Sequence, residues 1–133
     1  MINRKIKFRA YLKNEKKIID VKSIDWDENG NLISINYPEG KDYFGYEKDD
    51  IILMQYTGVR DKNGEEIYEG DIVEWLSAKF EIKWLLSSFC ICNWKIGNLA
   101  LEIGVNQCGI QNRLIVIGNI YENPELLEKN KVK

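Results

Sequence analysis

The sequence predicts a mainly β protein, and three observations support this fold class. Short segments in which apolar and polar residues alternate recur about every eight to twelve residues, as in all-β domains. Asn-Gly pairs at 29–30 and 63–64 suit the positive φ angles of tight hairpin turns. With 44% apolar and 30% charged residues among 133, the composition is that of an ordinary folded domain. We therefore expect one domain, or two small lobes, built from β-hairpins and a small barrel or sandwich.

The first half of the chain is expected to form an N-terminal β-hairpin lobe. Residues 4–12 alternate between apolar and mainly basic side chains, which predicts a half-buried strand. Residues 16–26 are rich in β-branched side chains and predict a second strand, which the turn at 29–30 connects to a third at 32–37. A further strand is expected over 51–56, after an acidic segment that also suits a short helix.

The second half is expected to form a meander from Gly70 to Tyr121, because strand patterns and turn signals alternate there. The expected strands are 71–76, 80–86, 89–96, 99–105 and 113–121. After them, Asn123 followed by Pro124 predicts a short C-terminal helix, in which Asn123 caps and proline takes the first position. The lysine-rich end is expected to be a charged tail.

Composition also limits the classes of function. The net charge of −2 gives no overall positive field for nucleic acid or an anionic membrane. No apolar run reaches the roughly 18 residues of a membrane span, and the N-terminus has no apolar stretch behind its charges, so we expect neither a membrane segment nor a signal peptide. The three cysteines are then expected to be free thiols in a reducing cytoplasm.

The chain contains no histidine. It therefore lacks the commonest general base near neutral pH, and Ser-His-Asp and Cys-His nucleophile systems are excluded. Zinc sites that need imidazole are excluded as well. We expect a protein that is not an enzyme, with no catalytic residues and no cofactor.

Three segments in the same order resemble the YopX family of phage and prophage proteins. They are KIKFRA at 5–10, LMQYTGVRDKNGEEIYEGDIVEW at 53–75 and VIGNIYENPELL at 116–127. After the first segment, the family pattern suggests an aromatic residue such as tryptophan. This sequence has Tyr11 there, which is a mild departure. The resemblance implies a small β protein with an SH3-like barrel in its second half, a phage origin and a bacterial host cytoplasm. It implies no activity.

Together, pattern and resemblance predict the domain organisation. We expect a single YopX-like domain in which an N-terminal β lobe, residues 1–58, packs on an SH3-like barrel with its C-terminal tail, residues 70–133. A connecting corner, residues 59–69, would join the two parts.

The central segment contains five carboxylates: Asp61, Glu65, Glu66, Glu69 and Asp71. Such a cluster suits a divalent cation or acid–base catalysis, so a carboxylate-dependent metal-binding protein or enzyme is one alternative. Counted from Asp61, however, the residues fail the EF-hand pattern, since its sixth position needs glycine and its twelfth needs glutamate. We therefore expect no metal here.

A structural interpretation of the same segment explains more of its residues. Asn63 and Gly64 would form the turn, and the Asp61 carboxylate can cap its corner. Gly70 permits a bend, and Asp71 accepts backbone N–H groups that the bend exposes. This leaves polar groups beyond what a corner needs. We expect them to form a binding rim with five candidate residues: Gln55, Tyr56, Thr57, Asp61 and Tyr68.

Cysteine pattern and basic charge offer two further candidate sites. Cys90 and Cys92 share one strand face, but with Cys108 they supply only three of the four ligands of a structural zinc site, so we expect reduced, metal-free thiols. Lys5, Lys7 and Arg9 form a basic strip that is the candidate nucleic-acid contact, although lysines also protect edge strands from aggregation.

The function expected from the sequence is that of a phage accessory protein that binds without catalysis. Its partner would be a host or phage protein or a second copy of the chain. The alternatives are the carboxylate-dependent protein described above and a weak nucleic-acid binder that uses the basic strip. No membrane partner is expected.

Overall fold

Strands dominate the computed structural model, which describes residues 5–39, 42–85, 87–93, 97–100 and 109–127. Twelve strands and three short 3₁₀ helices are formed by these residues. The chain divides into two compact units, Lys7–Gln55 and Tyr56–Lys133 together with Met1–Ile6. The predicted mainly β architecture is confirmed, and none of the helices formed by the described residues has the length and hydropathy needed to cross a membrane.

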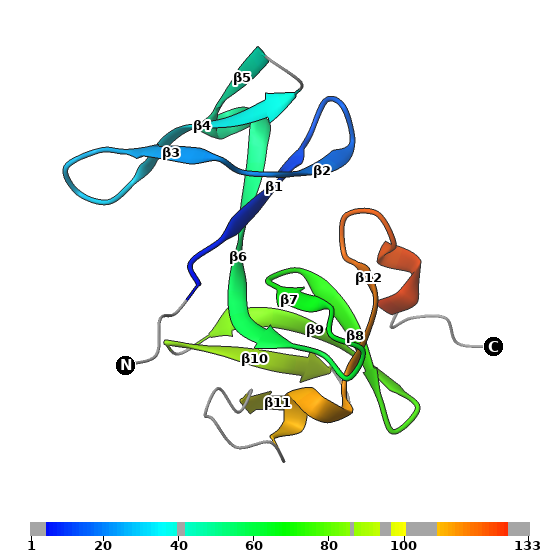
Figure 1. Ribbon diagram of the computed structural model, residues 1–133. Helices are drawn as coiled ribbons and strands as arrows, with labels where there is room; N and C mark the ends of the chain where they lie inside the picture. The colour runs from blue at the N-terminus through cyan, green and yellow to red at the C-terminus, as the bar shows by residue number, and fades with distance from the viewer. Residues whose placement is uncertain (1–4, 40–41, 86, 94–96, 101–108, 128–133) are drawn as a thin grey trace. The chain divides into compact units, whose positions relative to one another are not determined.

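The N-terminal unit contains two sheets. Its elements are β1 (Phe8–Leu12), β2 (Lys17–Asp20), β3 (Ser23–Trp26), β4 (Leu32–Glu39), β5 (Asp42–Glu47), η1 (Lys48–Asp50) and the first half of β6 (Ile51–Arg60). β1 lies between β2 and β6, and β4 lies between β3 and β5 (Figure 1). Apolar side chains from both sheets share a core. Its fully buried members include Ala10, Leu12 and Ile35.

The expected strand at 16–26 is wrong in one respect, because the chain forms two strands there, in different sheets. The break follows from backbone hydrogen bonds at residues 21 and 22. The N–H of Val21 donates to the carbonyl oxygen of Phe8 at 3.1 Å, whereas the N–H of Lys22 donates to that of Asn36 at 2.8 Å. The chain therefore leaves the β1 sheet and joins the β4 sheet within two residues.

The C-terminal unit is built around a curled meander of antiparallel strands. Its elements are β7 (Glu66–Tyr68), β8 (Asp71–Trp75), β9 (Ala78–Leu85), β10 (Ser88–Asn93), β11 (Gly97–Ala100), η2 (Ile110–Arg113), β12 (Ile115–Asn119) and η3 (Pro124–Leu127). The five-stranded sheet has the order β11-β10-β9-β8-β12, so the chain returns to β8 after the meander. This curled half-barrel carries the predicted SH3-like character (Figure 1).

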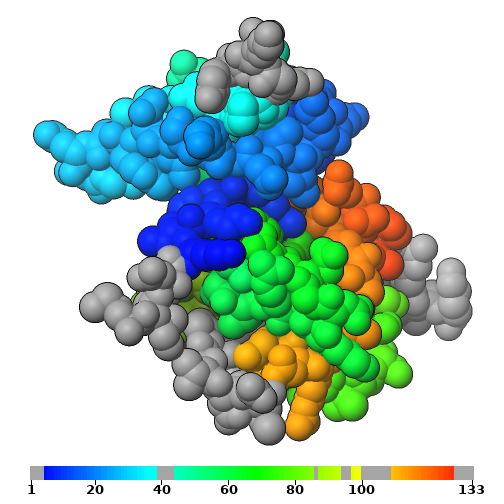
Figure 2. Space-filling view, viewed as in Figure 1, coloured from blue at the N-terminus to red at the C-terminus, as the bar shows by residue number. Residues whose placement is uncertain are grey.

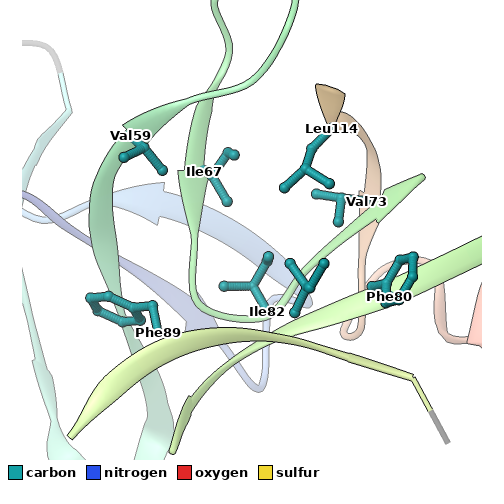
Figure 3. Close-up of a cluster of buried hydrophobic side chains, with 8 residues drawn as sticks. Val59, Ile67, Val73, Phe80, Ile82, Phe89 and Leu114 are labelled. Carbon is teal, nitrogen blue, oxygen red and sulfur yellow. The ribbon is translucent and has the colours of Figure 1, made fainter. Parts of the chain in front are cut away.

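Apolar side chains fill the concave side of this sheet. Figure 3 shows Ile82 and Phe80 from β9 pointing toward Val73 of β8 and Leu114, with Ile67 and Val59 contributed by the hairpin of β6 and β7. Phe80 and Ile82 are buried as the period-two alternation of β9 predicts, whereas Trp84, the next residue of that alternation, is 53% exposed. The remainder of the predicted strand at 99–105, and Cys108, lie outside the described residues.

A network of asparagines forms the turn before the C-terminal helix. Oδ1 of Asn119 accepts the backbone N–H groups of Tyr121 and Glu122, at 3.0 and 2.8 Å. Oδ1 of Asn123 accepts the N–H of Asn119 at 3.2 Å, so its side chain holds the turn that leads to the helix. This packing leaves no space for a side chain at Gly118, whose added Cβ would stand 2.6 Å from Oδ1 of Asn123.

Candidate functional site

The turn between β6 and β7 is built around the buried carboxylate of Asp61, which is 5% exposed. Its Oδ1 accepts the backbone N–H groups of Asn63 and Glu65, at 2.8 and 2.9 Å. Its Oδ2 accepts the N–H of Val116 in β12 at 2.8 Å. Hydrogen bonds to an ionised acceptor are among the stronger ones in proteins. Asp61 therefore closes the turn and connects it to a strand 55 residues later.

Gly64 stands in the left-handed region with φ at +86°, so the predicted positive φ at this turn is confirmed. Its N–H donates to the carbonyl oxygen of Asp61 at 3.0 Å. The neighbouring N–H of Lys62 donates to the carbonyl oxygen of Leu114 at 2.9 Å. Figure 2 shows the consequence, since the green segment that contains the turn lies directly beside the orange segment at 110–116.

Gly70 and Asp71 organise the entrance to β8. Gly70 has φ at +84°; its N–H donates to the carbonyl oxygen of Ile82, and its own carbonyl accepts the N–H of Ile120, at 2.9 and 2.8 Å. Asp71 is 2% exposed, and its carboxylate accepts the N–H of Tyr68 at 2.8 Å. Both aspartates of the central segment therefore hold backbone in place.

Thr57 is buried, with 5% of its surface exposed. Its hydroxyl donates to the carbonyl oxygen of Ile67 at 2.7 Å and accepts the N–H of Val59 at 3.3 Å. A buried hydroxyl needs such partners, because an unpaired polar group inside a protein is costly. Thr57 thus joins β6 to β7 at a place where their register shifts.

Most of the candidate rim residues lie inside the hairpin. Tyr56, Thr57, Asp61 and Tyr68 are buried, and Gln55 is half-buried. The two tyrosines are register partners on β6 and β7, with ring centroids 5.5 Å apart. The hairpin directs these polar and aromatic groups inward, where they bond to backbone and pack on each other. A role of the rim residues in binding stays a prediction. The four buried side chains expose almost no surface to a partner.

The glutamates of the central segment do not join the aspartates in one cluster. Glu65 is exposed, whereas Glu66 accepts hydrogen bonds from the Arg60 guanidinium at 3.4 Å and from the Tyr68 hydroxyl at 3.3 Å. Among the described residues, no group of three histidine, cysteine, aspartate or glutamate side chains lies close enough to hold a metal ion.

The residues of the basic strip do not lie on an edge strand, although an edge strand was expected. Lys5 and Lys7 are exposed and precede β1, which begins at Phe8, while Arg9 is half-buried within that strand. β1 pairs with β2 on one side and β6 on the other, so it is not an edge strand and edge protection does not explain the lysines. Contact with nucleic acid stays a prediction.

The outer face of the half-barrel carries the thiols and a small pocket of about 120 Å³. Cys90 is buried and Cys92 half-buried, and both are free; burial raises the pKa of the Cys92 thiol. Lys83 and Glu81 line the pocket beside Cys92, with Nζ and Oε1 3.9 Å apart. A site of this size with charges of both signs offers little to select a ligand.

Strand β5 lies at an edge of its sheet in the N-terminal unit. The sequence interpretation missed this strand. β5 pairs with β4 over six residues in unbroken antiparallel register. The carbonyl of Asn36 in β4 accepts the N–H of Lys22, so the backbone groups of Asn36 face β3. Its register partner in β5 is Gly45. Because backbone groups alternate in direction along a strand, those of Gly45 and Glu47 face away from β4.

The other edges of the N-terminal unit carry features that discourage further pairing. β2 has four residues and begins with Lys17, and β3 has a bulge between Asp25 and Trp26. β5 contains neither lysine nor proline, and no register shift. Among the described residues, no backbone hydrogen bond from another segment reaches Gly45. We call the outward backbone of residues 44–47 the β5 edge.

Aromatic side chains cover one face beside the β5 edge. The Tyr37 ring lies 5.8 Å from those of both Phe44 and Tyr46, and Phe44 is 41% exposed. The Tyr46 hydroxyl donates to the Glu15 carboxylate at 2.6 Å, and this bond raises the pKa of Tyr46. The three aromatic residues within 42–47 were the signal for this strand, and they adjoin the acidic segment that suggested a helix.

Comparisons with known proteins agree with this architecture. The family model described as YopX protein matches residues 7–128. The chain is similar to the crystal structure of protein EF1440 from Enterococcus faecalis, with 26% identity, coverage of 95% of this chain and 100% of that one, and a TM-score of 0.64. Protein yopX from Bacillus subtilis has the same TM-score at 23% identity, with coverage of 96% and 98%. No curated protein matches the chain.

Proposed function

Because the chain belongs to the YopX protein family, and this family match indicates a fold but no reaction, we propose that the protein is a non-enzymatic module that binds a protein partner. The partner would add an extended segment to the β5 edge. The proposal includes the phage origin and the bacterial cytoplasm that the sequence motifs imply, and an accessory role in that setting.

The observation that carries this proposal is the unprotected β5 edge. Strand addition to such an edge supplies backbone hydrogen bonds for affinity, while alternate side chains supply specificity. Gly45 stands in the middle of the edge, exposed and without a side chain that would obstruct an approaching backbone. The exposed part of Phe44 offers an apolar contact for the partner's side chains on one face.

The hydrogen bonds of the central segment support a binding role over the carboxylate-dependent alternative. Asp61 and Asp71 are buried and accept backbone N–H groups. A general base must reach a substrate proton, and a metal ligand must turn its oxygens to the ion. Carboxylates engaged in this way serve the fold, so we favour binding over catalysis.

Selection from a random peptide display library, followed by amide hydrogen exchange, tests the proposal. Selected peptides should slow exchange at the amides of Gly45 and Glu47. Phe44 and Tyr46 provide an internal control, because their amides face β4 in either state and should change little. The absence of enriched peptides, or enriched peptides that leave Gly45 unchanged, would refute the β5 edge as the binding site.

A pair of substitutions separates the backbone contribution from that of the side chain. The backbone of Glu47 has φ at −77°, close to the value of about −65° that proline adopts. Glu47→Pro therefore removes an outward N–H with little strain and should abolish binding. Glu47→Gln keeps the N–H and should retain most of it. Equal binding by both variants would contradict strand addition.

A further inference from the structure

The N-terminal unit concentrates negative charge around the β5 edge, although the whole chain has a net charge of only −2. From residue 23 to residue 50 the sequence has eight acidic residues and two lysines, Lys41 and Lys48. This segment forms β3, β4, β5 and η1. A strand added to the β5 edge would therefore lie beside an acidic part of the chain.

The charges are concentrated at one end of the edge. Glu47 ends β5, and Asp49 and Asp50 follow in η1, all exposed. Two lysines face this end. Lys48 contributes to lowering the pKa of Asp27, and the Lys13 ammonium donates to the carbonyl oxygen of Asp49 at 3.0 Å.

The turn between β3 and β4 adds acceptors at the same end of the sheet. Asp27 lies in this turn, with Glu28 next to it in the chain, and its carboxylate accepts the N–H groups of Asn29 and Asn31 at 2.9 and 2.8 Å. With these two acidic residues, five carboxylates stand against the two lysines named above. The surplus at this end is negative.

The two faces of the sheet at β5 differ in chemistry. Phe44 and Tyr46 belong to the aromatic face, while Gly45 and Glu47 belong to the opposite face. On that opposite face, Oδ1 of Asn36 lies 3.0 Å from the place where a Cβ of Gly45 would stand. The Asn36 amide nitrogen is engaged with the Ser23 hydroxyl at 3.3 Å. This face therefore presents the acceptor oxygens of Asn36 and Glu47 beside Gly45, which has no side chain.

We propose that the β5 edge selects an extended segment that alternates apolar and basic side chains. The apolar side chains lie on the Phe44 face, and the basic ones lie across Gly45 toward Asn36 and Glu47. This inference rests on the proposed function and adds the chemical class of the partner segment. Electrostatic complementarity sets the choice of partner, while the backbone bonds of the edge supply the docking geometry.

Three capped heptapeptides test the inference against the whole protein: KVKVKVK, EVEVEVE and KKVVVKK. The first has the proposed pattern, the second reverses the charge, and the third keeps the composition of the first without its alternation. Affinity is measured by titration, and the site by amide exchange at Gly45. We expect KVKVKVK to slow exchange at Gly45 and to bind about tenfold more tightly than the other two peptides at low salt.

The outcomes separate this inference from the proposed function. If KVKVKVK and EVEVEVE protect Gly45 equally, the edge binds strands but the preference for basic segments is wrong. If neither peptide protects Gly45, the proposed function fails as well. If Gly45 is already protected without peptide and the protein sediments as a dimer, a second copy occupies the edge, and the inference is overturned.

Charge reversal supplies a matched control. The variant Glu47→Lys with Asp49→Lys should shift the preference from KVKVKVK to EVEVEVE. The variant Glu65→Lys with Glu125→Lys changes the net charge equally but alters two exposed residues of the C-terminal unit, and it should leave the preference unchanged. Equal effects of the two variants would show that only net charge matters and would refute a site at the β5 edge.

Discussion

Replacing Asp61 with alanine should destabilise the protein far more than an ordinary turn substitution. The change removes both acceptor oxygens and with them three hydrogen bonds from backbone N–H groups. Asn63 and Glu65 lie on the exposed side of the turn, so water can replace the carboxylate for their N–H groups. The half-buried N–H of Val116 belongs to β12, where a replacement is harder to provide.

These differences set the expected magnitude. Losing a bond to a charged acceptor typically costs about 1.5–3 kcal/mol, and we apply that range to Val116. The two turn bonds should cost about 0.5–1 kcal/mol each, since water compensates for part of their loss. The sum predicts a loss of about 2.5–5 kcal/mol in the free energy of unfolding for Asp61→Ala. Asp61→Asn should cost somewhat less, since it keeps the Oδ1 acceptor but turns an amide N–H toward Val116.

Urea unfolding followed by tryptophan fluorescence measures these changes, provided that the dependence on denaturant stays constant among the variants. Glu65→Ala is the matched control, because Glu65 is an exposed carboxylate in the same turn. It should change stability by less than about 0.5 kcal/mol. A loss below about 1 kcal/mol for Asp61→Ala would refute the structural role that we assign to this residue.

Four further predictions concern individual residues. Thr57→Ala should cost about 1–2 kcal/mol in urea unfolding, because the carbonyl oxygen of Ile67 loses its buried donor; a change under about 0.3 kcal/mol would contradict this. Gly64→Val should also cost about 1–2 kcal/mol, entirely from backbone strain, since nothing lies within 4 Å of an added Cβ. Leu76 and Ser77 both have positive φ, so replacing them with Asn-Gly should raise the free energy of unfolding by about 1 kcal/mol; a lower free energy of unfolding would show that the exposed leucine stabilises the fold. Finally, carbonyl NMR should place the pKa of Asp27 below 3.8, because its hydrogen bonds favour the ionised form; its contribution to stability is present above that ordinary value and is lost as the pH falls through the lowered pKa.

Much of the fold follows from local chemistry and could be predicted. The turn at 63–64 needs a residue that tolerates positive φ, and Gly64 supplies it. Gly70 and Asp71 play the predicted parts at the entrance to β8 for the same reason. Period-two alternation gives the buried face of β9 directly. In each case the information lies within a few neighbouring residues.

Features decided by distant parts of the chain could not be predicted in this way. The division of residues 16–26 between two sheets depends on carbonyl groups of Phe8 and Asn36. The hairpin at Leu76 and Ser77 forms without the glycine or asparagine that marks such turns, so its positive φ angles leave no local signal.

The burial of the candidate rim residues could not be predicted for a related reason. Polarity alone does not reveal whether a hydroxyl or carboxylate meets solvent or a backbone partner. Thr57 looks like a surface residue in the sequence, yet its hydroxyl bonds to backbone inside the hairpin. The cap predicted for Asp61 is present, but its further bond to β12 has no local signal. The β5 edge, by contrast, is defined by the absence of a further neighbour among the described strands, and no residue type encodes that directly.

The claim that the protein binds through the β5 edge, and not through the polar segment at 55–68, is tested most directly by residue-resolved amide exchange with and without a bound peptide. Binding at the β5 edge predicts slower exchange at Gly45 and Glu47 when KVKVKVK is bound, with the amides of Asn63 and Glu65 unchanged. Slower exchange at 55–68, with Gly45 unaffected, would contradict it and return the binding site to the central segment.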